Sequence, residues 1–189
     1  MARLAALEPP YADDIAADFA AIMGKGKEPL TLFTTLAASP RAWRKFRGGA
    51  LLDGRLLGLR EREIVIDRTC ARTGCEYEWG VHVAIFADKA GLTHEEIASL
   101  LAVPADLSTW SARETALIAA VDALHEGSTL SGAEFAALEA HYDRDQILEI
   151  IMLAGFYRTV SYLASGLDLA LEPGAARFSD YTGFRDFCA

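Results

Sequence analysis

Three side chains that could do chemistry together lie within one short stretch of the sequence. Cys75, Glu78 and His82 are spaced i, i+3 and i+7, and in an α-helix these positions share one face over about two turns. A thiol, a carboxylate and an imidazole in one row can act as a nucleophile with acid–base assistance. The spacing therefore predicts an enzyme active site on this helix.

The start of that helix bears on the reactivity of the thiol. Thr73 and Glu76 form a T-x-x-E capping box, which predicts Thr73 as the N-cap and places Cys75 at the second helical position. Backbone N–H groups there lack helical partners and favour an anion, so a thiolate pKa can fall from ~8.5 to roughly 3.5–7.5. Arg72 acts in the same direction, whereas Glu76 and Glu78 oppose it.

Helix start signals recur along the chain and indicate the fold class. Four further capping boxes precede apolar patterns of helical spacing: Thr93–Glu96, Ser111–Glu114, Ser131–Glu134 and Asp143–Gln146. Glycines suited to helix ends follow at Gly91, Gly127 and Gly166. An alternating strand pattern with a hairpin turn is not found. The sequence predicts an all-α bundle of about eight helices, forming one domain over residues 1–189.

A weak internal repeat divides this domain. The segments Leu92–Leu100 and Leu130–Leu138 share the pattern L-[ST]-x-x-E-[IF]-A-[SA]-L. The second copy lacks a segment the size of the helix with Cys75, so we expect the chemistry in a motif core at about 57–101. Supporting helices are expected over 111–170 and an aromatic tail over 174–189.

Composition excludes several classes of partner. The formal net charge is −9 and the pI is about 4.9, which disfavours nucleic acid and anionic membranes, since both attract clustered Lys and Arg. We found no apolar run of the ~18 residues that a membrane span requires. Three cysteines, an odd count, favour a reducing compartment, and the cytoplasm is the predicted location.

At these residues the sequence resembles the alkylhydroperoxidase D-like, carboxymuconolactone decarboxylase family. Its thiol-peroxidase motif is a glutamate followed by C-x-x-C-x-x-x-H, which aligns with Glu63, Cys75 and His82 and is best matched over about 57–101. Glu78 stands where the motif has its second cysteine, so the dithiol of the family is missing. The resemblance implies the family's helical fold and a homo-oligomer.

These residues predict first a peroxidase-type oxidoreductase with a single reactive thiol. Cys75 would attack a hydroperoxide, His82 would act as base or proton shuttle, and Glu63 would orient it or relay the proton. Glu78 would join the relay or bind a polar substrate group. No cofactor is required, and an external thiol would serve as reductant, because Cys70 is expected in the core and Cys188 in a terminal tail.

Acid–base chemistry without a cofactor is the second predicted function. Glu63, Glu78 and His82 would decarboxylate or otherwise transform a small carboxylic acid or lactone, and Arg158 would bind the substrate carboxylate.

Two further functions are compatible with the same residues. A metal site at Glu78 and His82, completed by Cys75 or Glu63, is less favoured than a polar pair inside the bundle. A non-catalytic oligomeric binding protein is also compatible, with an aromatic tail that docks on its own domain or on a neighbouring subunit: Phe178, Tyr181, Phe184 and Phe187.

Overall fold

The structure, a computed structural model, describes residues 2–49 and 56–182. Within these ranges it contains nine α-helices, two short 3₁₀ helices and no strand, so the predicted all-α fold is confirmed with one helix more than expected. The helices are α1 (Asp13–Met23), α2 (Thr31–Ala37), α3 (Pro40–Gly49), α4 (Leu59–Arg72), α5 (Glu76–Ala90), α6 (His94–Leu101), α7 (Ala112–Gly127), α8 (Gly132–Glu139) and α9 (Arg144–Gly166). The 3₁₀ helices are Leu107–Thr109 and Phe178–Asp180.

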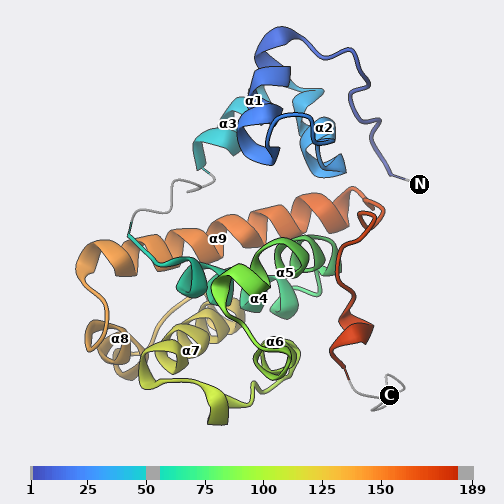
Figure 1. Ribbon diagram of the computed structural model, residues 1–189. Coiled ribbons are helices and arrows are strands. Elements are labelled where there is room, and N and C mark those ends of the chain that lie inside the picture. Colours follow the sequence, from blue (N-terminus) through green and yellow to red (C-terminus); the bar gives the residue numbers. More distant parts are fainter. Residues whose placement is uncertain (1, 50–55, 183–189) are drawn as a thin grey trace.

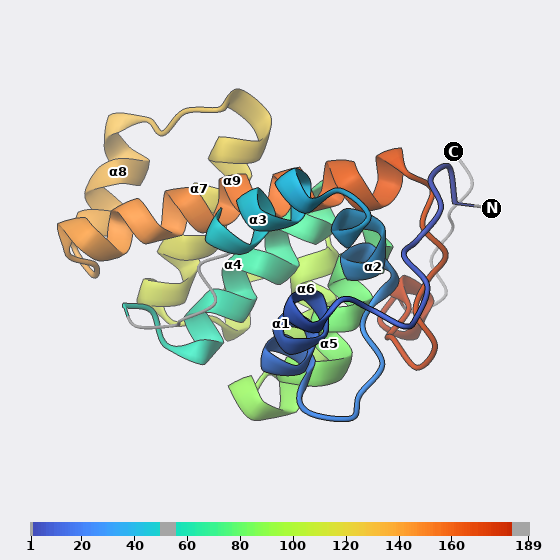
Figure 2. The same ribbon diagram turned by 90° about the horizontal axis from the view of Figure 1, so that it is seen from above.

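The first three helices form a separate layer on one side of the bundle (Figure 1). Seen from above, α3 lies over α9 (Figure 2), where the rings of Phe46 and Phe156 pack with centroids 5.2 Å apart. The backbone N–H of Leu32, in α2, donates to the Tyr77 hydroxyl of α5 at 3.0 Å. This layer therefore covers the side of the bundle formed by α5 and α9.

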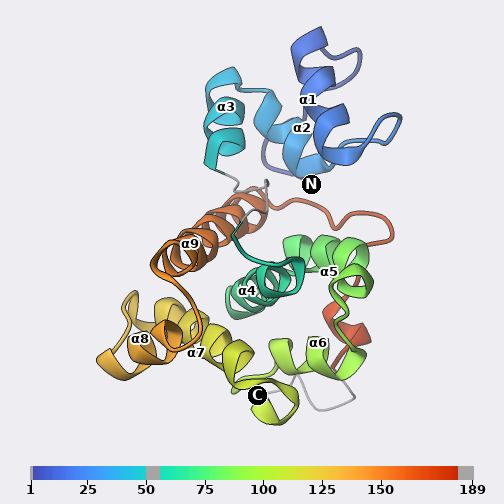
Figure 3. The same cartoon turned by 60° about the vertical axis from the view of Figure 1, so that its left-hand side comes forward.

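Helix α4 runs through the centre of the bundle, with α5, α6, α7 and α9 around it (Figure 3). Every residue from Arg62 to Cys70 is buried, so this part of α4 is covered on all sides, as expected of a central helix. Arg68 is completely buried and holds α7 with two 2.7 Å hydrogen bonds to Asp122. Polar side chains on α4 are thus fixed inside the protein.

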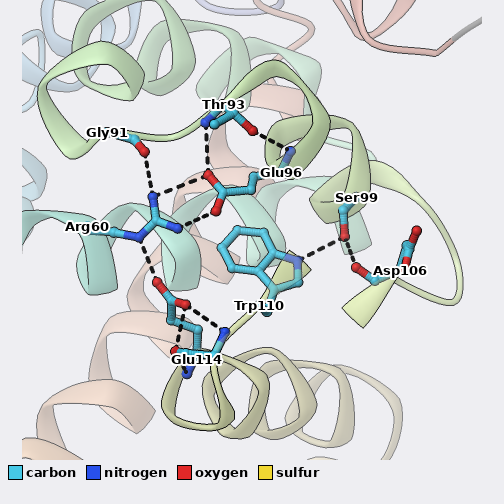
Figure 4. A network of polar contacts seen from close by, with 9 residues as sticks. Arg60, Gly91, Thr93, Glu96, Ser99, Asp106, Trp110 and Glu114 are labelled. Atoms are coloured by element: carbon cyan, nitrogen blue, oxygen red, sulfur yellow. Dashed lines mark hydrogen bonds and ion pairs between the residues drawn. The ribbon is translucent and has the colours of Figure 1, made fainter. Parts of the chain in front are cut away.

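The four later capping boxes are confirmed, and two of them are joined to α4. Glu96 and Glu114, the third helical residues of α6 and α7, cap their own helices. Arg60 at the start of α4 donates to both carboxylates, at 2.5 Å to Glu96 and 2.6 Å to Glu114 (Figure 4). The sequence repeat corresponds to α6, which packs on α4, and α8, which packs on α7.

The predicted capping box at Thr73 is wrong. Thr73 ends α4 as its C-cap, and its hydroxyl contacts the carbonyl oxygens of Thr69 and Cys70 instead of capping α5. Gly74 then reverses the chain with φ of 67°, which glycine adopts without steric cost. Cys75 is the N-cap of α5 instead of its second helical residue, so α5 begins two residues later than predicted. The prediction was wrong because the Thr73 hydroxyl can bond either to the last carbonyl groups of one helix or to the first N–H groups of the next.

The described part of the aromatic tail docks on its own domain. Phe178 and Tyr181 pack edge-on against Trp79 with ring centroids 4.9 and 5.4 Å away. Gly80 makes this possible, since a Cβ there would lie 2.3 Å from the carbonyl oxygen of Ala176. Phe184 and Phe187 lie outside the described residues.

Helix α9 is one described helix whose length and apolar composition would allow it to cross a membrane. This differs from the sequence-based expectation that the chain has no such run. Of its most apolar window, 44% is buried inside the protein, and positions such as Ile150, Leu153 and Tyr157 lie in the core. A core helix passes the same test, so this feature is weak evidence for a membrane span.

Candidate active site

His82 is the centre of a buried polar network between α4, α5 and α9. Its Nδ1 lies 2.8 Å from Glu63 Oε2, which reaches across from α4. Its Nε2 faces Glu78 Oε1 at 3.4 Å, one turn earlier on α5, and the Tyr157 hydroxyl of α9 at 3.2 Å. The structure therefore brings together three of the four predicted site residues and adds Tyr157.

The carboxylates control the charge of this imidazole. Burial disfavours the charged ring, but Glu63 and Glu78 outweigh it and raise the pKa of His82 to about 10. With both ring nitrogens protonated at neutral pH, His82 donates to Glu63 on one side and towards Glu78 and Tyr157 on the other. Burial, with Glu78 and Glu63 nearby, keeps the pKa of Tyr157 well above its ordinary value, so it remains a neutral phenol.

This network opens into a cavity of about 390 Å³, at the lower end of the size range of small-molecule pockets. Its lining includes Glu63, Glu78, His82 and Tyr157. The walls are mainly apolar and come from both the N-terminal layer and the bundle: Ile22, Met23, Leu30, Phe33, Phe46, Leu57, Leu59, Val81, Ile85, Phe86 and Phe156. Such a cavity can hold a small, largely apolar molecule against proton donors and acceptors.

Two basic side chains complete the lining. Arg62 precedes Glu63 on α4, is buried, and lies 3.7 Å from Glu149 Oε1. Lys27 comes from the segment between α1 and α2. The lining of the cavity therefore contains groups of both charges. The positive ones are Lys27, Arg62 and protonated His82, and the carboxyl groups are those of Glu63 and Glu78.

Cys75 lies behind the network, outside the set of described residues that line the cavity. The residue is 1% exposed. Burial raises the pKa of its thiol above the ordinary value, and this effect outweighs the Glu78 amide and the Ser161 hydroxyl, which lower it. Arg72 is held by Asp122 and Glu126 on α7. The helix start therefore leaves Cys75 a buried thiol with a raised pKa.

Arg158 also lies apart from the predicted site. It lines a second, smaller cavity of about 210 Å³ and donates to the carbonyl oxygen of His125 at 3.1 Å. It is not among the described residues around the larger cavity, whose lining contains Arg62 instead. The described residues include no group of three or more His, Cys, Asp or Glu side chains arranged to hold a metal ion.

A comparison with protein-family models tests the resemblance. The model described as "Carboxymuconolactone decarboxylase family" matches residues 37–122, which run from the end of α2 into α7 and contain Glu63, Cys75, Glu78 and His82. The resemblance to this family is confirmed over these residues. A comparison with curated protein sequences finds no match.

Solved structures share the fold of this chain. An uncharacterized peroxidase-related protein from Ralstonia eutropha JMP134, described as an alkylhydroperoxidase AhpD core, is 21% identical, with a TM-score of 0.77 over 90% of this chain and 92% of that one. An uncharacterized peroxidase-related protein from Silicibacter sp. TM1040 is 17% identical, with a TM-score of 0.75 over 95% and 93%. A cysteine-to-alanine variant of the debrominase Bmp8, in complex with 2,3,4-tribromopyrrole, is 13% identical, with a TM-score of 0.76 over 90% and 92%.

Tyr157 and Arg62 line the same cavity as the predicted residues, and the sequence pattern does not reveal them. Tyr157 follows the apolar periodicity of its helix, so its pattern is that of a core residue. Arg62 is one of several arginines in a segment rich in charged residues. Only the tertiary contact between α4, α5 and α9 brings them to His82 and the cavity, and no local signal distinguishes them.

Proposed function

We propose that this protein is an enzyme that transfers protons, without a cofactor, on a small carboxylic acid, keto acid or lactone bound in the larger cavity. One observation carries the proposal: Glu63, hydrogen-bonded to His82, and Glu78, 3.4 Å from the other ring nitrogen of His82, line one apolar cavity together with His82. Buried acid–base groups converging on an apolar pocket are the usual arrangement of a catalytic site.

Each side chain has a role in this chemistry. A substrate carboxylate is bound by Lys27 and Arg62, the two basic side chains of the lining, and Arg62 also pairs with Glu149. When the bond to a carboxylate breaks, the electron pair passes to a neighbouring carbonyl group, and the protonated Nε2 of His82 stabilises the enolate oxygen. Because the pKa of His82 is about 10, the ring keeps its proton at neutral pH and acts as a hydrogen-bond donor.

The carboxylates complete the cycle. Glu63 holds Nδ1 of His82 and so fixes the ring orientation. Glu78 Oε2 has no hydrogen-bond partner among the described residues, which suits a group that takes up or delivers a proton at the substrate carbon. Tyr157 donates a second hydrogen bond to the developing oxyanion.

A peroxidase reaction at Cys75 alone is the second candidate. Its support is the names of two similar structures, which are peroxidase-related proteins, and the variant cysteine of the debrominase structure. Burial of the thiol at 1% exposure and its raised pKa place this reaction second, since the thiolate is the reactive form.

Two matched variants separate these candidates. Carbon dioxide release and lactone turnover are measured over a panel of small keto acids and lactones, and hydroperoxide consumption is measured with a thiol reductant. We expect His82→Ala to lower kcat/KM for proton transfer by about 10²-fold or more, and Cys75→Ser to change it by less than about threefold. Loss of turnover in Cys75→Ser, with His82→Ala unaffected, would reject the acid–base proposal in favour of thiol chemistry.

A further inference from the structure

The outward face of α9 carries a stripe of exposed residues without a charge. In Figure 3 this helix runs along the edge of the bundle, with α4 on its inner side. Leu148 is 54% exposed, Met152 57% and Tyr162 61%, and Gly155 and Thr159 lie exposed between them. By contrast, the exposed positions of α3 include three basic residues: Arg41, Arg44 and Lys45. The stripe on α9 is therefore not an ordinary solvated helix face.

The spacing of the stripe is that of a helix-packing seam. Its five residues follow one another at intervals of four, three, four and three positions, which is the spacing along which two helices pack side by side. The positions that face the core of the bundle are different ones, such as Ile150, Leu153 and Tyr157. Helix α9 therefore has one apolar face for its own bundle and a second one that its own chain leaves uncovered.

Gly155, near the middle of α9, indicates what covers this face. Glycine in the interior of a helix is destabilising relative to alanine. A Cβ at this position would meet no other part of the described chain within 4 Å, so nothing in the fold of one copy requires glycine there. A glycine does allow the backbone of a second helix to approach closely.

The smaller cavity opens beside Gly155. From α9 its lining takes Ile151, Ala154, Gly155 and Arg158, and most of the rest comes from α7, including Val121 and Leu124. The cavity measures about 210 Å³. The four heavy atoms of a methionine side chain, at the roughly 30 Å³ that one water occupies in the liquid, need about 120 Å³. A methionine from outside the chain therefore fits, and its flexible thioether suits an irregular space.

We propose that a second copy of this chain packs on the stripe, with the two α9 helices antiparallel and a two-fold axis beside Gly155. In this register Leu148 faces the partner's Tyr162. The partner's Met152 lies opposite Arg158 and enters the smaller cavity, while Met152 enters the cavity of the partner. Each copy thus supplies both the methionine and the cavity that receives it, which is the self-complementarity that a two-fold interface requires.

Charge favours this surface and this direction. The formal net charge of −9 makes two copies repel each other, so an interface between them has to avoid carboxylates, and the stripe exposes none from Leu148 to Tyr162. A parallel pair would bring the two Arg158 side chains together and leave the smaller cavity empty. In the antiparallel pair these side chains are about 9 Å apart along the helix axes.

This interface goes beyond the acid–base function and does not depend on it. None of the five residues of the stripe is among the described residues that line the larger cavity. The family resemblance implies a homo-oligomer but gives no surface for it, whereas the stripe gives both a surface and a register. The tests below measure mass and cross-linking, so their outcome is independent of any enzymatic activity.

Light scattering and sedimentation velocity over a concentration series test the surface. The chain has a mass of 20.5 kDa, and we expect twice this mass or an even multiple of it. Met152→Glu should weaken the association by about 10²-fold or more, because it places a carboxylate in an apolar interface. Val103→Glu is the matched control: Val103 is 67% exposed but lies after α6, away from α9, and its substitution should leave the mass unchanged.

Three results would overturn the proposal. One is a monomeric wild type at about 100 μM, where a specific interface should be occupied. Another is an oligomer whose mass Met152→Glu leaves as unchanged as Val103→Glu does, with circular dichroism showing both variants folded. The third is a monomer that sediments with phosphatidylcholine vesicles and is released by Met152→Glu, which would assign the face to a membrane.

Cross-linking tests the register in a Cys188→Ser background, where the remaining cysteines, Cys70 and Cys75, are buried. The double variant Leu148→Cys/Tyr162→Cys places two thiols about 21 Å apart on one helix, too far for an intramolecular disulfide. In the antiparallel pair each thiol faces its counterpart in the partner. We expect oxidation with copper phenanthroline to give a covalent dimer of the double variant and to leave each single variant monomeric on a non-reducing gel. A covalent dimer of either single variant, or none of the double variant, would overturn the antiparallel register.

Discussion

The two ends of one helical row behave differently. Cys75, Glu78 and His82 lie along α5 at the predicted spacing, yet the His82 end opens on the cavity and the Cys75 end is sealed, 1% exposed. Spacing along a helix decides which side chains share a face, but contacts with α4 and α9 decide which of them meets a ligand. A row of reactive side chains is therefore not one site.

The charge of Glu78 has opposite consequences for the reactivity of His82 and of Cys75. Negative charge from Glu63 and Glu78 stabilises the His82 cation, and Glu78 raises the pKa of the Cys75 thiol. A thiolate–imidazolium pair would need the imidazole to face the sulfur. Here both ring nitrogens are directed to oxygen atoms instead, so His82 is a hydrogen-bond donor to these oxygen atoms and not the partner of a thiolate.

Glu78→Gln should change both ends at once. Removing the charge lowers the pKa of His82 and that of Cys75, since Glu78 raises both. A fall of about one pKa unit makes the thiolate fraction of Cys75 about tenfold larger at fixed pH. NMR titration of His82 and the pH dependence of Cys75 alkylation measure the two shifts. Opposite shifts at the two residues would contradict a shared electrostatic cause.

Glu63→Gln should separate the ends. Glu63 bonds to Nδ1 of His82, and its charge is among the causes of the raised His82 pKa but not of the raised Cys75 pKa. We expect the pKa of His82 to fall by about one unit or more, with alkylation of Cys75 unchanged. The exposed Glu139→Gln variant is a control for loss of one negative charge. Equal changes at Cys75 and His82 would show that the two ends are not electrostatically separate.

Local sequence signals predicted most of the helices and part of the candidate site. Capping boxes such as Ser131–Glu134 marked helix starts because their hydrogen bonds are local, and the spacing of Glu78 and His82 gave a real contact. The failures share one cause. Thr73 caps the end of α4 instead of the start of α5, and Arg158 lines the smaller cavity. Both positions depend on how distant helices pack, and periodicity within one helix does not encode this packing.

Asp67 extends the comparison to a carboxyl group on α4, one turn after Glu63. It is fully buried, and neither oxygen has a hydrogen-bond partner among the described residues. Burial, followed by the charge of Glu63, raises its pKa well above the ordinary value, while His82 acts weakly against this. Asp67 is therefore a neutral acid in the folded protein, whereas in the unfolded chain it ionises with a pKa of ~3.9.

Asp67→Asn should therefore stabilise the protein at neutral pH, with the smallest effect of the three substitutions. Because the folded-state pKa is raised, the contribution of the carboxyl group to stability is complete below pH ~4 and falls as the pH rises towards the folded-state pKa. The amide has the same shape and no proton to retain, so it escapes this loss. We expect Tm to rise by about 2–4 °C per kcal/mol recovered at pH 7.5, and the gain to vanish near pH 4. A gain of equal size at both pH values would mean that packing, not protonation, distinguishes the two side chains. It would also contradict an effect of the Glu63 charge on the pKa of Asp67.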